Sequence, residues 1–184
     1  MNIVVTGYAG LEGSTILYDN QTFREKLLSR YAESFFDILR NEQVNTQPEG
    51  LNRLFLREKE QGRAGDASEG GVLSALWRVL KARRLGGTYS QKDIPVLQQT
   101  IEICEMFALN PYRLHAPGCR VWLSEDTDQI FREAAPAGVP LRVIGFTSKG
   151  AAIKRTDAAG ESSLRRPEGD ELDKFRSGGV FKVR

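Results

Sequence analysis

The sequence has few of the residues from which disulfide frameworks, zinc sites and catalytic triads are built. Its 184 residues include two cysteines, Cys104 and Cys119, and one histidine, His115. Two cysteines are too few for a disulfide framework, and one histidine does not complete a tetrahedral zinc site with them. No Ser-His-Asp or Cys-His arrangement can be argued around His115. We therefore predict no metal site and no catalytic residue.

A strong charge of one sign and long apolar runs are also missing. The net charge is +2, and the basic residues are scattered among the acidic ones, so no electrostatic footprint for nucleic acid stands out. No apolar run approaches membrane-spanning length, and the N-terminus lacks a basic-then-apolar signal pattern. We expect a cytoplasmic protein that binds neither nucleic acid nor a membrane. The 40% hydrophobic and 27% charged residues are the balance of a globular domain.

What the sequence does have is a glycine-rich run that leads into an apolar helical pattern at residues 72–77: Gly65-Asp66-Ala67-Ser68-Glu69-Gly70-Gly71. A helix start carries unpaired N–H groups and the positive end of the helix dipole, so it favours a phosphate or carboxylate. Gly70 and Gly71 leave room for that approach, and Ser68 or Asp66 can cap the first turn. The alternative is a tight turn in which Ser68 caps a core helix. The spacing matches neither phosphate-binding fingerprint and favours this alternative.

A second glycine-rich segment, residues 7–14, follows the β-branched stretch at residues 2–6. Both segments place glycines beside an ordered element, so we predict that they face each other around a small anionic ligand. Glu69 adds a negative charge to its turn, and binding is weak unless that side chain points outward. The sequence does not identify the ligand, and any cofactor is unknown. The predicted ligand-binding residues are Gly7, Gly10, Glu12, Gly13, Ser14, Asp66, Ser68, Glu69, Gly70 and Gly71.

Apolar periodicity predicts an α/β (α+β) fold with a mixed sheet covered by helices. Strands are expected at residues 2–6, 88–90, 119–123 and 141–146, and a hairpin at 151–165. Helices are expected at residues 22–39, 48–61, 72–85, 98–109 and 170–175, and a further helix that Ser124 or Thr127 caps and Pro136 stops. The capping-box pair Thr22 and Glu25 indicates where the first helix begins. We assign residues 1–176 to one domain and residues 177–184 to a flexible C-terminal tail.

Three segments together carry a family resemblance: Val4–Ser14, Asp66–Val72 and Ile103–Tyr112. In this order and spacing they resemble the C-terminal domain of the aminoimidazole ribonucleotide (AIR) synthase superfamily. That superfamily includes thiamine monophosphate kinase, selenophosphate synthetase and the hydrogenase-maturation dehydratase that acts on a carbamoylated cysteine. The resemblance is strongest to hydrogenase-maturation-factor-like proteins and runs from Ile3 to about Phe175.

The resemblance also implies what this sequence does not contain. Family members have an N-terminal domain whose aspartate-rich Gly-Asp-Asp segment serves magnesium and nucleotide phosphates, and no such segment occurs here. Gly65 stands where the family usually has histidine, and Ser68 where it has threonine. Residues 116–119 replace a Ser-Gly or Glu-Gly element, and the terminal cysteine tail of the dehydratase is missing.

Three functions remain open from the sequence. The first is an accessory protein that binds a small anionic ligand without autonomous ATPase activity. The second is one half of a two-chain ATP-dependent enzyme of the hydrogenase-maturation or AIR synthase type, and the third is a structural or interaction protein with a degenerate site. In two-domain relatives the surface near the glycine loops faces the partner domain. We therefore expect a homodimer or a complex with an AIR synthase-like N-terminal domain protein.

Overall fold

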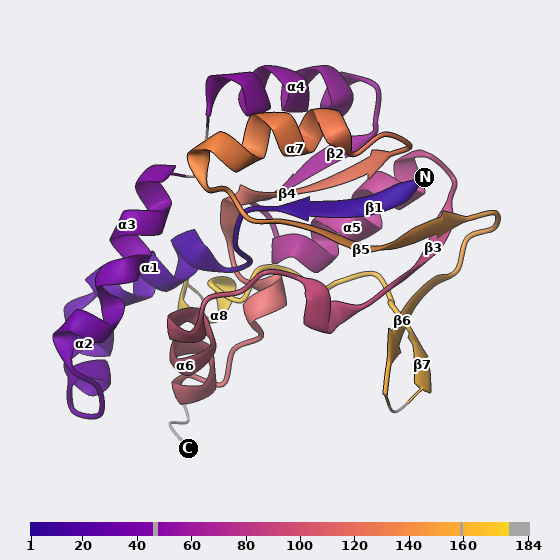
Figure 1. Cartoon of the computed structure of the whole chain (residues 1–184). Helices are drawn as coiled ribbons and strands as arrows, with labels where there is room; N and C mark the ends of the chain where they lie inside the picture. The colour runs from indigo at the N-terminus through magenta and orange to yellow at the C-terminus, as the bar shows by residue number, and fades with distance from the viewer. Residues whose placement is uncertain (46–47, 159, 177–184) are drawn as a thin grey trace.

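A mixed sheet of seven strands runs through the molecule in the order β2-β4-β1-β5-β3-β6-β7 (Figure 1). The computed structural model describes residues 1–45, 48–158 and 160–176, so the predicted tail at 177–184 lies outside the described residues. The strands are β1 (Asn2–Thr6), β2 (Ala64–Ala67), β3 (Gly86–Tyr89), β4 (Ala116–Ser124), β5 (Leu141–Ser148), β6 (Ile153–Asp157) and β7 (Gly160–Ser163). Among these strands neighbours pair antiparallel, except for the parallel pair β3 and β6.

Helices cover both faces of this sheet and one end of it (Figure 1). α4 (Glu49–Glu60) and α7 (Asp128–Ala134) lie over one face, and α5 (Gly71–Ala82) packs on the other. α1 (Leu11–Asp19), α2 (Gln21–Leu28), α3 (Asp37–Asn45) and α6 (Gln98–Met106) form a separate helical cluster, which α8 (Asp173–Arg176) joins through Phe175. The predicted α/β class with a mixed, helix-covered sheet is therefore confirmed.

The central strand β1 owes its place to three consecutive apolar residues. Ile3, Val4 and Val5 have no exposed surface. Because side chains alternate along a strand, Ile3 and Val5 enter the cluster under α5, while Val4 enters the cluster under α4 and α7. Trp122 in β4 also lies under α4 and α7, and its Nε1 donates to Thr6 Oγ1 at 2.9 Å. β1 is thus a continuous apolar strand that contributes to the hydrophobic clusters on both faces of the sheet.

The structure differs from the sequence prediction at several places. The second glycine-rich segment, expected as a loop over residues 7–14, continues into helix α1, so Glu12, Gly13 and Ser14 are helical. The helix expected at residues 22–39 ends at Leu28 and resumes as a 3₁₀ turn (Glu33–Phe36) and α3, because the aromatic rings of this segment stack on one another and on Tyr18. Its cap is Asn20, whose side chain accepts from the backbone N–H of Thr22, so the capping box placed the start wrongly. Part of the predicted glycine loop is strand β2, which pairs with β4 although its residues have little strand propensity.

The segment between α6 and β4 is approached by glycines from both predicted loops. A Cβ atom on Gly71 would lie 2.5 Å from the Tyr112 carbonyl oxygen, and one on Gly10 would lie 2.9 Å from that of Pro111. A Cβ on Gly7 would clash with the carbonyl of Gly118. These positions require glycine for backbone packing, whether or not a ligand binds.

We expect Gly71→Ala to lower the free energy of unfolding more than Gly138→Ala does. The two glycines have φ values of 68° and 67°, so the conformational strain, roughly 1–2 kcal/mol, is shared. Nothing lies within 4 Å of a Cβ on Gly138, whereas Gly71 faces backbone. The additional loss at Gly71 should be about 1–3 kcal/mol, the usual cost of overpacking. Urea unfolding of both variants measures this difference, and equal losses would contradict the packing role.

Candidate functional site

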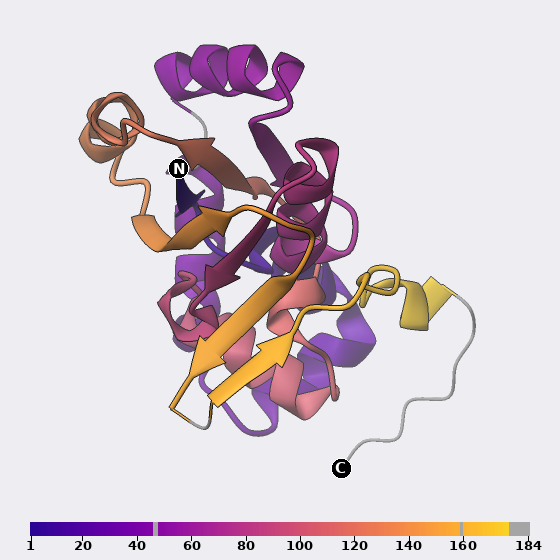
Figure 2. The ribbon, with the colours of Figure 1, turned by 90° about the vertical axis from the view of Figure 1, so that its right-hand side faces the viewer.

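A pocket of about 600 Å³ opens beside the N-terminal end of α5. Ser68, Glu69 and Gly70 from the predicted site line it, together with His115 and residues 166–170, which follow the β6–β7 hairpin. Figure 2 shows this last segment leaving β7 and running to α8. The structure therefore places the predicted helix start at a cavity, and it adds a chain segment that the sequence did not connect with it.

Asp66 and Ser68 bind each other instead of capping α5. Asp66 accepts hydrogen bonds from the Ser68 hydroxyl, from the Ser68 N–H at 3.2 Å and from Lys59 Nζ at 2.8 Å. The cap residue is Gly70 (φ 69°), and no side chain within the loop caps the helix, so the expected Ser68 or Asp66 cap is wrong. Burial raises the pKa of Asp66, but the bonds from Lys59 and Ser68 outweigh it and lower that pKa to about 2.

The carboxylate that does reach the helix start belongs to Asp170. Its Oδ2 accepts from the Gly70 N–H at 2.9 Å, across 100 residues of sequence. Its Oδ1 accepts from the backbone N–H groups of His115 at 3.3 Å and Leu172 at 3.0 Å. An anionic oxygen thus occupies the predicted position. Sequence reasoning missed Asp170 because no local pattern relates it to the glycine loop.

Glu69 and Arg78 set the charge around this turn. The Glu69 side chain is exposed, so it points outward as the sequence analysis required for an anion to bind at this turn. The guanidinium group of Arg78 donates to the carbonyl oxygens of Glu69 at 2.8 Å and Asp66 at 2.9 Å. Arg78 therefore holds the loop through two of its carbonyl oxygens and places one positive charge at the edge of the pocket.

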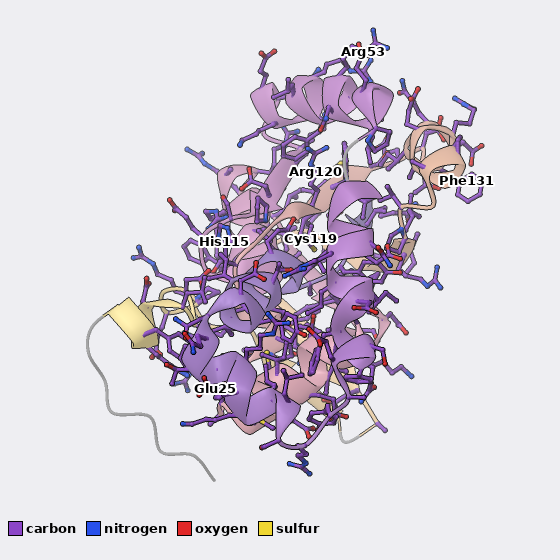
Figure 3. All side chains as sticks on the ribbon, turned by 90° about the vertical axis from the view of Figure 1, so that its left-hand side faces the viewer. Glu25, Arg53, His115, Cys119, Arg120 and Phe131 are labelled. Carbon is purple, nitrogen blue, oxygen red and sulfur yellow. The ribbon has the colours of Figure 1, made fainter. Side chains whose placement is uncertain are left out.

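His115 connects the two predicted loops. Its carbonyl oxygen accepts from the Gly13 N–H at 2.8 Å, and its ring Nδ1 lies 2.7 Å from the carbonyl oxygen of Ser68. Because a carbonyl only accepts, this contact assigns the proton to Nδ1. Ser14, predicted as a ligand-binding residue, is fully buried and its hydroxyl bonds to the Gly10 carbonyl and to Thr100. Figure 3 places His115 and Cys119 near the middle of the molecule, below α4.

Glu12 has a buried carboxylate with unused bonding capacity. The residue is 9% exposed, and its Oε1 accepts from the Gly118 N–H at 2.8 Å. Oε2 is buried and has no hydrogen-bond partner in the described part of the chain. Burial raises the pKa of Glu12. Burial, and then the charge of Glu12, also raise the pKa of the Cys119 thiol, which makes a reactive thiolate unfavourable there.

The described residues hold neither a metal-ligand cluster nor a membrane-spanning helix. Within residues 1–45, 48–158 and 160–176, no cluster of three or more histidine, cysteine, aspartate or glutamate side chains is arranged to hold a metal ion. None of the helices in the same ranges is both long and apolar enough to cross a membrane.

We expect Glu12→Gln to stabilise the protein by about 1 kcal/mol at pH 8, because it removes a buried charge with an unpaired oxygen. The folded-state pKa of Glu12 is raised, so the wild-type protein gains stability as pH falls through it towards the ordinary carboxyl value. The advantage of glutamine should therefore shrink in acid. Urea unfolding between pH 8 and pH 4 measures the trend, with the exposed Glu60→Gln as the control. A pH-independent difference between the Glu12 variant and wild type would contradict it.

The chain is similar to known proteins in both sequence and structure. No family model matches the chain. A protein of Methanocaldococcus jannaschii named for hydrogenase expression and formation is 28% identical over 156 residues, which are 80% of this chain and 42% of that protein. The chain therefore spans less than half the length of this curated relative.

Two solved structures have the same fold as this chain. The hydrogenase maturation protein HypE of Escherichia coli superposes with a TM-score of 0.61 and 20% identity, over 90% of this chain and 49% of HypE. Thiamine-monophosphate kinase of Stenotrophomonas maltophilia gives 0.54 and 18% identity, over 84% of this chain and 49% of the kinase. The resemblance inferred from three sequence segments is confirmed: the chain has the fold shared by HypE hydrogenase maturation proteins and AIR synthase-like enzymes, and it spans about half the length of these two structures.

Proposed function

We propose that this chain is an accessory, anion-binding domain of the HypE and AIR synthase type, which binds a small anionic group at the start of α5 and does not hydrolyse ATP by itself. One observation carries the proposal: the Gly70 N–H already holds a carboxylate oxygen at 2.9 Å beside a pocket of about 600 Å³. A helix N-terminus favours an anion through its unpaired amides and its dipole. Arg78 and Arg166 also line the pocket, although its carboxylates outnumber them.

The partner in this proposal is the part of the fold that the chain does not span. One solved structure of similar fold is a HypE–HypF complex. This chain covers 52% of the chain that it matches there, with a TM-score of 0.61. Another is a HypE in complex with ATP, with 50% of that chain covered. We propose that an AIR synthase-like N-terminal domain protein, or a second copy of this chain, packs against the glycine-loop surface.

A second candidate function is one half of a two-chain ATP-dependent enzyme. The Glu12 carboxylate favours this second function. It is buried, its pKa is raised and one of its oxygens has no partner in the described residues, and carboxyl groups that transfer protons often have these properties. Glu12 would then act only when a partner completes the site. The two functions differ in one measurable property, which is ATP turnover after a partner is added.

We expect the backbone amides of Gly70 and Gly71 to shift in an NMR titration with pyrophosphate, because these amides border the anion site. The titration is run at constant ionic strength, with the amide of Gly138 as an internal control, since it is also a positive-φ glycine but lies at the end of another helix. Shifts spread evenly over the spectrum, or none at Gly70 and Gly71, would rule the anion site out.

We expect no ATP hydrolysis above background when the purified chain is given Mg²⁺ and ATP. The physical reason is that no cluster of three or more possible metal ligands is arranged to hold Mg²⁺ in the described residues, and Asp66 is already held by Lys59 and Ser68. Phosphate release is the measurement. Activity that survives repurification and disappears in Asp66→Asn would overturn the accessory role and favour an enzyme.

A further inference from the structure

The segment that brings Asp170 to the glycine loop is anchored at one end and exposed at the other. We call residues 168–172 the strap. The strap ends in the buried Glu171 and Leu172, which are 2% and 7% exposed, and the Glu171 N–H donates to the Arg113 carbonyl oxygen at 3.2 Å. Glu168 and Gly169 at its other end are exposed. Arg113 also reaches this end: its Nη2 donates to the Gly169 carbonyl oxygen at 3.2 Å and lies 3.6 Å from Glu168 Oε2.

The carboxylate of Asp170 uses the donors that an external anion would need. It accepts from Gly70 at the start of α5 and from His115 in the segment that connects the two glycine loops. A phosphate oxygen placed on the Gly70 amide would occupy the position of Asp170 Oδ2. Because one N–H cannot donate fully to two anionic oxygens in the same place, the two states exclude each other.

The charge of the pocket in this state also opposes an external anion. Carboxylates outnumber guanidinium groups along its lining, which holds the side chains of Glu69, Glu168, Asp170, Asp173, Arg78 and Arg166. Like charges near a protein surface repel one another, so these carboxylates oppose a second anion. Withdrawal of the Asp170 carboxylate would free the amide and reduce this repulsion together.

We propose that Asp170 is a built-in competitor for the anion site, so that an anion binds only when the Asp170 carboxylate rotates or swings away. The inference rests on the proposed function and adds a regulation of the same site. Movement is confined to residues 168–170, because Glu171 is held by Arg113 and Lys174, and Leu172 stays in the helical cluster. A swing of this end also releases the hydrogen bond from Arg113 to the Gly169 carbonyl oxygen. Gly169, which has no side chain to restrain it, adjoins Asp170 and serves as the hinge.

The test compares pyrophosphate binding to four proteins by amide NMR: the wild-type chain, Asp170→Asn, Asp170→Ala and Glu168→Gln. If the competitor occupies the site about nine-tenths of the time, its removal strengthens the apparent affinity about tenfold. We expect that gain in both Asp170 variants. Glu168→Gln is the matched control, since it removes one negative charge from the same pocket lining but its side chain is 89% exposed and bonds to neither amide.

Each outcome decides a different point. Equal affinity in wild type and both Asp170 variants, or an equal gain in Glu168→Gln, would overturn the competitor while leaving the anion site in place. Weaker binding in the Asp170 variants would show that Asp170 positions the loop, which also overturns the proposal. No binding by any of the four proteins would instead overturn the proposed function. Unchanged amide shifts away from the strap confirm that each variant is folded.

Discussion

Close backbone approach around the segment between α6 and β4 is the constraint on which the site depends. Glycines from two separate loops meet main-chain carbonyls of this segment, and the ring and carbonyl of His115 connect the same loops through hydrogen bonds. A Cβ atom at Gly10 or Gly71 would clash with this segment, and one at Gly7 would clash with the carbonyl of Gly118 in β4. The glycines that suggested a ligand in the sequence are thus also required by the architecture, and ligand binding has to be argued from donors and charges instead.

The sequence predicted those parts of the fold whose signals are local. β1 and α5 follow from β-branched residues and from helical periodicity, and the β6–β7 hairpin follows from the aspartate and glycine that the sequence has at 157 and 160. β2 was missed because its stability comes from pairing with β4 and not from its own residues. The break after Leu28 was missed because aromatic stacking in three dimensions outweighs a continuous helical stripe.

The candidate site shows the same limit. The sequence located Gly70 and Gly71 at a helix start, which is where the structure has them, and it singled out Glu12, which turns out to be the buried acid with an unpaired oxygen. It assigned the cap to Ser68, but the hydroxyl of Ser68 satisfies Asp66 instead. Asp170 lies 100 residues from Gly70, so only the three-dimensional structure could bring its carboxylate to that amide.

The position of β1 in the chain has a consequence for how the protein acquires its structure. Its partners on both sides, β4 and β5, come more than a hundred residues later, as the 116-residue separation of Thr6 and Trp122 shows. During synthesis, Ile3, Val4 and Val5 therefore leave the ribosome as an apolar strand with both edges unpaired. Loops of that length are slow to close, and unpaired apolar strands attract other chains. The nascent chain must keep its most aggregation-prone segment shielded until the last third of the domain has been made.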